Sequence, residues 1–231
     1  MLEKKKKITK KEIKQDTLVT TYYKVYNFFL EHQAKILIAL AAVALIVVSI
    51  VIYSNKRSSD NLTAANLLAK VIPLYDAGQY QQAIEGIKAQ NIVGLKSIVE
   101  NYGSTEQGET AKIYLANCYL FLNKIDSAYE MFKDYDGSNP LFKAASLAGQ
   151  AAYYETKKEY EKAVDAYKDA AKISKENPLN ADYLLKAGIN LLRLNKKSEA
   201  KTIFELIKKD YKNYPEAREV ERYIVQVESW F

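Results

Sequence analysis

The sequence contains a single cysteine, Cys118, and a single histidine, His32, among 231 residues. One cysteine cannot form an intramolecular disulfide, and one cysteine with one histidine cannot supply the four ligands of a structural zinc site. Glycine and proline are also scarce, with eight and four copies. A chain that is poor in turn-forming residues and rich in Ala, Leu, Lys and Glu is typical of a mostly helical protein.

Motifs of common catalytic and phosphate-binding sites are missing as well. Gly103 and Gly108 lie in a polar stretch without a following Gly-Lys-Ser/Thr, so there is no phosphate-binding loop. The carboxylates occur three or four residues from lysines, as on solvated helix faces. Cys118 lies between Leu115 and Tyr119, where a small packing residue is a better interpretation than a reactive thiol. We therefore expect a protein that is not an enzyme and that needs no cofactor and no metal.

Positive charge is concentrated near the start of the chain. Residues 1–59 hold eleven Lys/Arg and four Asp/Glu, whereas residues 60–231 are close to neutral. A nucleic-acid-binding domain would carry its Lys/Arg clustered on the folded part of the chain. The charge distribution therefore predicts that nucleic acid is not a partner.

One long apolar run follows the basic stretch. Residues Ile36 to Ile52 contain a single polar member, Ser49, and no charge. A helix of this length spans about 26 Å, close to the hydrocarbon thickness of a membrane. Lys35 can extend to the headgroups at one end, and Tyr53 can lie in the aromatic belt at the other. We therefore predict a transmembrane helix over residues 35–53, with the lipid bilayer as a partner.

Other interpretations of this run are less consistent with its flanks. A buried core helix would seldom be apolar on every face, and a cleaved signal peptide would be followed by a small-x-small site that is absent here. Orientation follows from the nine lysines of the short N-terminal tail, because short basic segments stay in the cytoplasm. We expect a cytoplasmic tail over residues 1–34 and a periplasmic domain over residues 54–231.

Aromatic residues precede the apolar run at helical spacing. Leu18, Val25 and neighbouring aromatics share one side of a predicted helix. This pattern predicts an amphipathic helix in the cytoplasmic membrane interface, although an ordinary juxtamembrane helix without a partner remains an alternative. The residues that we assign to the membrane interface are Tyr22, Tyr26, Phe29, Lys35 and Tyr53.

The remainder of the chain contains helical hairpins that resemble one another. Each second helix opens with a small residue, at Ala83, Ala128, Ala163 and Ala200. The last two spacings are close to the period of about 34 residues typical of one class of helical repeat. The first spacing is longer, which predicts an insertion within residues 91–108.

Bulky residues and prolines recur in register with these alanines. A small residue lets the two helices of a hairpin approach each other, and a bulky residue four positions later can fill the gap to the next hairpin. These bulky residues are Ile87, Phe132, Tyr167 and Phe204. Pro140, Pro178 and Pro215 recur where new helices are expected to begin, a position that tolerates the missing N–H of proline.

This pattern resembles the tetratricopeptide repeat over about residues 64–214. The resemblance implies an all-α fold: an N-terminal transmembrane helix, an α-solenoid of about four hairpins, and a C-terminal capping helix over residues 216–228. Two features depart from the repeat. The tryptophan common early in the first helix of each repeat is absent, and Pro73 lies inside the first predicted helix, where it should kink the helix or cost about 3 kcal/mol.

The layout as a whole is similar to a narrower family, the YfgM-like ancillary subunits of the bacterial Sec translocon. The stretch Lys11-Glu12-Ile13-Lys14-Gln15-Asp16-Thr17-Leu18-Val19 resembles one found in members of that group. The resemblance implies an accessory translocon component in the bacterial inner membrane, whose partners are translocon subunits, periplasmic chaperones or emerging secretory chains. A structural adaptor of another envelope machine and a eukaryotic organelle-membrane receptor remain alternatives. The sequence does not indicate an oligomeric state.

A stack of helical hairpins curves, and the first helix of each hairpin lines its concave face. Mapping the repeat onto this chain predicts a protein-binding groove there, with apolar residues in the second and fourth hairpins and small residues in the third. Burial of these side chains by neighbouring helices, or by the C-terminal helix, is the alternative. The candidate groove residues are Ile113, Tyr114, Asn117, Leu120, Phe121, Leu185, Lys186, Ile189, Leu192 and Arg193.

Two further features of the chain leave the partner open. A clamp for a carboxylate terminus uses several Lys, Arg or Asn side chains, and only Lys186, Arg193 and Asn117 qualify, so we do not expect such a clamp. Trp230 and Phe231 at the end of the sequence either pack on the last helix or form a docking tail.

Overall fold

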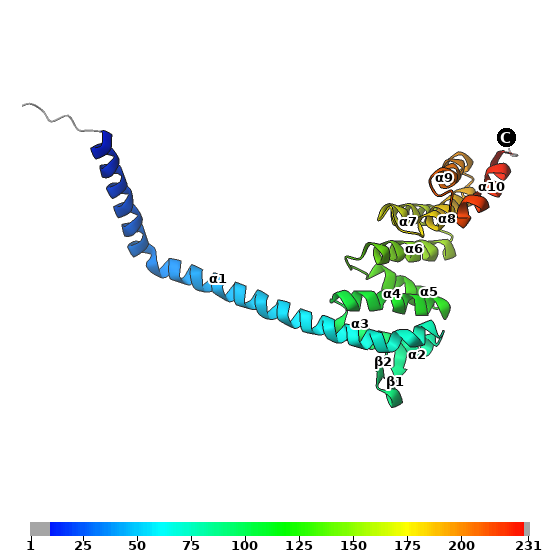
Figure 1. The fold of residues 1–231 in the computed structure, drawn as a ribbon, viewed down its shortest axis with the longest axis horizontal. Coiled ribbons are helices and arrows are strands. Elements are labelled where there is room, and N and C mark those ends of the chain that lie inside the picture. The colour runs from blue at the N-terminus through cyan, green and yellow to red at the C-terminus, as the bar shows by residue number, and fades with distance from the viewer. Residues whose placement is uncertain (1–9, 229–231) are drawn as a thin grey trace, which may run out of the picture. The chain divides into compact units, whose positions relative to one another are not determined.

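A computed structural model of the chain describes the backbone of residues 10–228 and the side chains from residue 17 onward, so Trp230 and Phe231 lie outside the described residues. The predicted all-α fold is confirmed (Figure 1). The elements are α1 (Lys10–Asp76), α2 (Tyr80–Glu85), β1 (Gly86–Ile87), the 3-10 helix η1 (Lys88–Gln90), β2 (Ile92–Val93), α3 (Leu95–Tyr102), α4 (Glu106–Phe121), α5 (Ile125–Lys133), α6 (Pro140–Thr156), α7 (Tyr160–Lys172), α8 (Asn180–Arg193), α9 (Lys197–Asp210) and α10 (Pro215–Glu228).

The chain divides into two units, residues 1–56 and residues 57–231. Helix α1 contributes to both, because its residues up to Lys56 belong to the first unit and those from Arg57 belong to the second. The first unit holds the predicted membrane segment. The second unit holds the hairpins, and we call it the repeat domain.

Four helical hairpins follow one another in the repeat domain (Figure 1). They pair the end of α1 with α2, α4 with α5, α6 with α7, and α8 with α9. Each hairpin has a first helix, here helix A, and a second, helix B. The final helix α10 packs against both α8 and α9, which is the position of the predicted capping helix.

The alanines that aligned the repeats are all at helix contacts. Ala83, Ala128, Ala163 and Ala200 are each completely buried. On helix A, Ala116 and Ala151 are also completely buried. Small residues on both sides allow the two helices of a hairpin to pack closely, which confirms the alignment made from the sequence.

The turn between helix A and helix B has the same geometry in every hairpin. Gly78, Asn123, Lys158 and Asn195 adopt positive φ angles of 72°, 56°, 61° and 59°. Each lies five residues before the shared alanine of its hairpin. A left-handed residue ends helix A and lets the chain reverse, a conformation that Gly and Asn adopt at the lowest cost.

Three of the four predicted bulky residues fill the space between hairpins. Phe132, Tyr167 and Phe204 are at most 2% exposed. The prediction was wrong for Ile87, which is half-buried in strand β1. Helix α2 ends at Glu85, because Gly86 takes a φ of 82° and directs the chain into a small antiparallel hairpin.

The insertion in the first hairpin begins earlier than expected. It starts at Gly86, before the predicted range of 91–108, and consists of the β1–η1–β2 hairpin followed by α3. Helix α3 buries Leu95 and Ile98 in the same apolar cluster as Leu68 of α1. The insertion therefore completes the core of the first hairpin, whose helix α2 is only six residues long.

The prolines act at helix starts in two of three predicted cases. Pro140 and Pro215 are the first residues of α6 and α10. Pro178 is two residues before α8, because Asn177 forms a local turn in which its side chain accepts a hydrogen bond from the backbone N–H of Leu179. Pro73 does not end α1, which continues to Asp76. Its ring is exposed, so the carbonyl left without a partner can be solvated.

Candidate protein-binding surface

Some contacts in the repeat domain join helices that are not neighbours in the sequence. Helix α4 contacts α6, and α8 contacts α10, in addition to the B helices that separate them in the sequence. In a solenoid, the helices that approach each other across successive hairpins line the concave side. We call this face of α4, α6 and α8, with the end of α1 and the start of α2, the concave surface.

Four aromatic rings gather at one end of the concave surface, and we call them the aromatic cluster. Tyr80 stacks on Phe121 with ring centroids 4.4 Å apart. Tyr75 meets Tyr114 edge to face at 5.0 Å and Phe121 at 6.3 Å. Phe121 is nevertheless 60% exposed, so one side of its ring is open to a partner. Exposed aromatic rings of this kind are frequent anchors in protein–protein interfaces.

A polar network links the third and fourth hairpins at the other end, and we call it the Glu155 network. One carboxylate oxygen of Glu155 accepts hydrogen bonds from Arg193 at 2.7 Å and from Asn190 at 2.9 Å. The other accepts a bond from the hydroxyl of Tyr167 at 2.8 Å. Burial first, and then the hydrogen bond to Glu155, raises the pKa of Tyr167, so this hydroxyl stays protonated and donates.

A second ion pair lies one turn away on α8. The ammonium group of Lys186 is 2.9 Å from the carboxylate of Asp182. The same ammonium group lies 5.9 Å from the ring centroid of Tyr167. Lys186 therefore already has an anionic partner and an aromatic face within the domain.

Small residues separate these two ends, as predicted. Ala145, Ala148, Gly149 and Ala152 of α6 are half-buried. Gly149 lies so close to the ring of Phe132 that an added Cβ would overlap it. Glycine is therefore required at this position by the packing beneath the surface, and its presence there does not by itself indicate a ligand.

The candidate groove residues fall into two groups. Ile113 and Leu185 are 3% and 5% exposed, and both belong to apolar core clusters, so they have almost no surface to offer a partner. The neighbouring helices bury them, which was the alternative left open by the sequence. The other candidates keep accessible surface: Tyr114, Asn117, Leu120, Phe121, Lys186, Ile189, Leu192 and Arg193.

Sequence reasoning missed three residues of this surface. Tyr75 and Tyr80 belong to the first hairpin, whose irregular pattern hid their relation to Phe121. Asn190 is completely buried and joins Glu155 to the backbone of Lys186 through its amide. Its signal was a polar residue on the apolar face of α8, one position before the buried Leu191.

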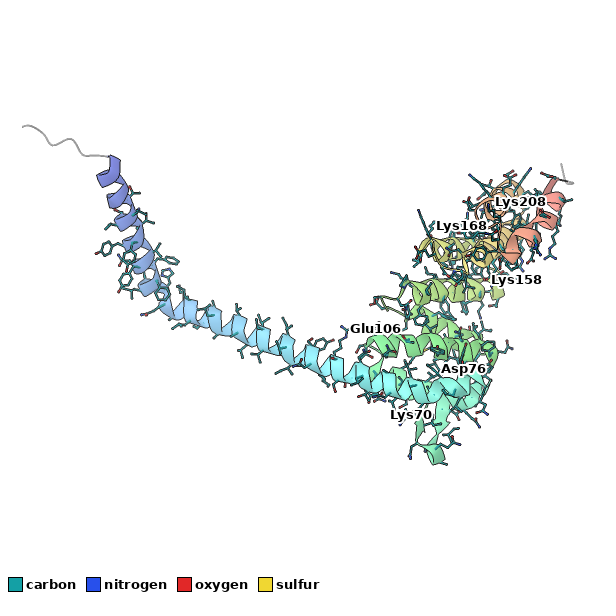
Figure 2. The ribbon with its side chains drawn as sticks, in the orientation of Figure 1. Lys70, Asp76, Glu106, Lys158, Lys168 and Lys208 are labelled. Atoms are coloured by element: carbon teal, nitrogen blue, oxygen red, sulfur yellow. The ribbon has the colours of Figure 1, made fainter. Side chains whose placement is uncertain are left out.

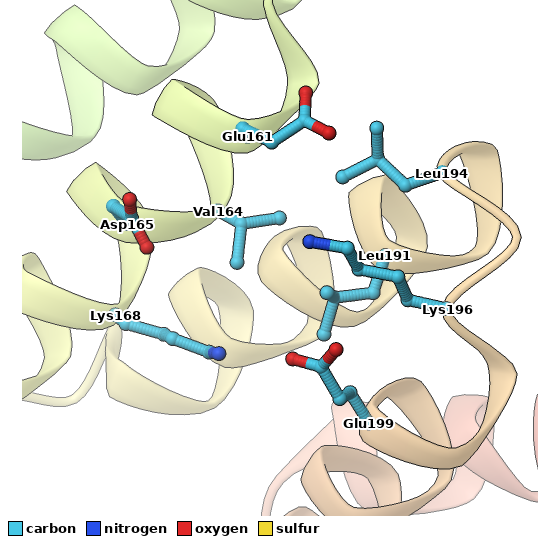
Figure 3. Close-up of a pocket in the computed structure, with 8 residues that line it drawn as sticks. All are labelled: Glu161, Val164, Asp165, Lys168, Leu191, Leu194, Lys196 and Glu199. Carbon is cyan, nitrogen blue, oxygen red and sulfur yellow. The ribbon is translucent and has the colours of Figure 1, made fainter.

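A shallow pocket of about 90 Å³ lies between α7, α8 and the start of α9 (Figure 3). Charges of both signs surround an apolar floor, since Glu161, Lys168 and Glu199 lie around Val164 and Leu191. This mixture is typical of the solvated groove between two hairpins and indicates no particular ligand.

The described residues form no obvious reactive centre. Within this part of the chain, no group of three His, Cys, Asp or Glu side chains is placed to hold a metal ion. Cys118 is completely buried in the core cluster of the first two hairpins. Burial raises the pKa of its thiol to about 11, so the thiolate is scarce near neutral pH.

The predicted membrane segment is a helix with its side chains exposed. Within residues 17–76 of α1, none of the most apolar eighteen-residue window is buried, and Figure 2 draws the side chains along this helix. By length and composition, this helix can cross a membrane. The predicted interface residues are all exposed, and Tyr22 stacks on Tyr26 with centroids 6.0 Å apart: Tyr22, Tyr26, Phe29, Lys35 and Tyr53.

Comparison with known proteins supports the repeat fold. No protein-family model matches the sequence, and no curated protein matches it. A crystal structure of a putative kinesin light chain from Podosopora anserina, with nearly identical TPR-like repeats, aligns with a TM-score of 0.52 and 14% identity, over 74% of this chain and 84% of that one. The structure of MamA MSR-1 C2 aligns with a TM-score of 0.46 and 16% identity, over 73% of this chain and 97% of that one. The repeat domain therefore has a TPR-like fold.

Proposed function

We propose that this chain is a membrane-anchored adaptor that binds other proteins through the concave surface of its repeat domain. The observation that carries the proposal is the open aromatic cluster, with Phe121 60% exposed on a fold built from stacked hairpins. An exposed ring costs free energy in water, and a partner that covers it recovers that cost. A TPR-like fold is in keeping with such an interaction role.

The anchor in this proposal is the apolar part of α1. Residues 35–53 cross the bilayer, residues 1–34 form a basic cytoplasmic tail, and residues 54–231 form the periplasmic domain. The support is an apolar helix of sufficient length with no buried residue in its most apolar window, together with the lysines that precede it. Tyr22, Tyr26 and Phe29 would then lie at the depth of the lipid headgroups.

We further propose that the adaptor serves the bacterial Sec translocon and holds periplasmic chaperones or emerging secretory chains. The resemblance of residues 11–19 and of the overall layout to the YfgM-like subunits supports this assignment. The translocon assignment depends on this resemblance, whereas the protein-binding role depends on the concave surface alone.

Two measurements test the proposal in parts. Alkaline carbonate extraction of membranes should leave the full chain in the pellet, and its release into the supernatant would contradict the anchor. Externally added protease should digest residues 54–231 in spheroplasts while leaving the N-terminal tail intact. Digestion of the tail alone would show that the chain has the opposite orientation in the membrane.

The translocon assignment has its own test. Purification of the full chain from gently solubilised membranes should recover translocon channel subunits. If the membrane segment holds these subunits, substitution of Phe121 should not change their recovery. Recovery of a different envelope complex without channel subunits would contradict the translocon role and would favour an adaptor of another machine.

A further inference from the structure

Two buried asparagines lie where the third hairpin joins the fourth. Asn177 is in the connecting loop, residues 173–179, and Asn180 is the first residue of α8. Asn177 is 3% exposed and Asn180 is completely buried, whereas Lys175 and Glu176 of the same loop are exposed. An asparagine side chain carries both donor and acceptor groups, and burying them without partners costs free energy. The amide atoms of these two residues therefore need partners inside the domain.

One atom of each amide is hydrogen-bonded. The Oδ1 atom of Asn177 accepts a hydrogen bond from the backbone N–H of Leu179 at 3.0 Å. The Nδ2 atom of Asn180 donates to the carbonyl of Ser174 at 2.7 Å. The same carbonyl accepts a bond from the backbone N–H of Asn177 at 3.2 Å. Both asparagines thus converge on the Ser174 carbonyl, whose two lone pairs are occupied.

The other atom of each amide is without a partner. Among the described residues, neither Nδ2 of Asn177 nor Oδ1 of Asn180 makes a hydrogen bond, although both atoms are buried. Reversing the amides would not satisfy them. A reversed Asn177 would point its amino group at the N–H of Leu179, and a reversed Asn180 would point its oxygen at the carbonyl of Ser174. One buried donor and one buried acceptor therefore remain, and they are chemically complementary.

The hydroxyl of Tyr183 lies close to this pair. Tyr183 follows Asn180 by about one turn of α8 and is 4% exposed. Burial raises the pKa of Tyr183, and the side chain of Asn177 opposes that rise, which requires the two groups to be near each other. The hydroxyl nevertheless does not reach hydrogen-bond geometry with Nδ2 of Asn177. Three polar groups thus gather at the start of α8 without bonding directly to one another.

We propose that the start of α8 binds a buried water molecule, held by Asn177, Asn180 and Tyr183. The water accepts a hydrogen bond from Nδ2 of Asn177 and donates one to Oδ1 of Asn180. Its remaining hydrogen or lone pair bonds to the hydroxyl of Tyr183, and a buried water makes about three such bonds. An ion does not fit, because the amino group of Asn177 repels a cation and the oxygen of Asn180 repels an anion.

The water completes the polar connection between the third and fourth hairpins. No side chain caps α8 among the described residues, since Leu179 at the preceding position is apolar. The junction therefore depends on the amides of Asn177 and Asn180, which the water joins. Helix α8 carries Lys186 and Arg193 of the concave surface, so the water helps to fix this helix relative to the third hairpin. The site is independent of the proposed protein-binding function.

X-ray radiolytic labelling tests for the water directly, because hydroxyl radicals form from water in place and modify adjacent side chains. In the full chain in lipid nanodiscs, mass spectrometry should show Tyr183 hydroxylated several-fold faster than Tyr167. Tyr167 is the matched control, because it is 1% exposed and its hydroxyl bonds to Glu155 at 2.8 Å. A bulk radical scavenger should protect Tyr214, which is 38% exposed, but not Tyr183. Labelling of Tyr183 only at the rate of Tyr167, or its loss on scavenging, would overturn the proposal.

Removal of the Tyr183 hydroxyl provides the second test. Tyr183→Phe should lower the thermal midpoint of the full chain by about 2–4 °C, because the water loses one of its partners. Removal of a buried hydroxyl that bonds to nothing would instead leave the midpoint unchanged or raise it. Tyr214→Phe is the control and should leave the midpoint unchanged, since Tyr214 is exposed. An unchanged or higher midpoint in Tyr183→Phe would contradict the bound water and leave the protein-binding proposal unaffected.

Discussion

The ring of Phe204 lies against the backbone of Gly188, so close that a Cβ added to Gly188 would overlap the ring. Gly188 is on helix A and Phe204 on helix B of the fourth hairpin, and Phe204 is completely buried. We expect Gly188→Ala to reduce the free energy of unfolding by about 1–3 kcal/mol through overpacking. Chemical unfolding of the full chain in detergent, followed by circular dichroism, measures this change.

A double-mutant cycle serves as its control. In a Phe204→Leu background, the smaller side chain should accept the added methyl group, so Gly188→Ala should cost less there than in the unmodified chain. An equal cost in both backgrounds would show that helix propensity or the backbone of α8, and not the ring, decides the effect.

A buried ion pair fastens α4 to the end of α5. The ammonium group of Lys112 lies 2.8 Å from Glu109 and 2.8 Å from Asp134, and its side chain is 8% exposed. Burial lowers the pKa of Lys112, but the hydrogen bonds to Asp134 and Glu109 outweigh it, so the pKa is raised and the charge is retained. We expect Lys112→Met to destabilise the fold by about 3 kcal/mol, because Glu109 is left buried without its cation.

An exposed pair provides the matched control for Lys112. Lys157 pairs with Asp126 at 2.9 Å, but both side chains are 43% exposed or more. Lys157→Met should therefore change the free energy of unfolding by less than about 1 kcal/mol. Similar losses in the two variants would contradict the structural role of the buried pair.

The third turn contains a side chain in a conformation better suited to glycine. Lys158 has a φ of 61°, whereas the equivalent turns use Gly78, Asn123 and Asn195. Lys158→Gly should raise the thermal midpoint, with a gain of about 0.5 kcal/mol after the entropy of glycine in the unfolded chain is subtracted. Lys158→Ala is the control, because it shortens the side chain but keeps a Cβ at positive φ, so it should not raise the midpoint as Lys158→Gly does.

The buried thiol predicts how the chain responds to alkylation and to pH. Native protein at pH 8 should react with iodoacetamide at Cys118 only after unfolding, and mass spectrometry distinguishes the two states. Burial raises the pKa of this thiol from 9.0 to about 11. Between these two values the unfolded chain releases a proton that the folded chain retains, so this group makes stability fall as the pH rises through that window. Rapid alkylation of the folded chain would contradict the burial.

The repeat register could be predicted because it rests on local steric requirements. Ala83, Ala128, Ala163 and Ala200 are completely buried, and small residues at such positions allow close helix packing, so their spacing revealed the hairpins. The start of the insertion could not be predicted, because Gly86 ends α2 with a positive φ where its backbone pairs closely with Ile92 and Val93, a contact that helical periodicity does not reveal.

The concave surface was only partly predictable for a related reason. Periodicity indicates which side of a helix is apolar, but it cannot tell whether a given apolar residue is covered by the next hairpin. Ile113 and Leu185 are covered, whereas Phe121 is exposed. The Glu155 network needed Tyr167 and Asn190 from two other helices, and such contacts between distant positions leave no trace in a single sequence.

The central claim is that partners contact the open end of the concave surface, and photocrosslinking from Phe121 tests it most directly. A photoreactive amino acid at position 121 of the full chain in native membranes should form adducts with a protein partner. The same amino acid at position 206 on helix B α9, where Leu206 is also exposed at 41% against 60% for Phe121, should form few adducts. Equal adduct yields at both positions, or no protein adduct at position 121, would contradict the account.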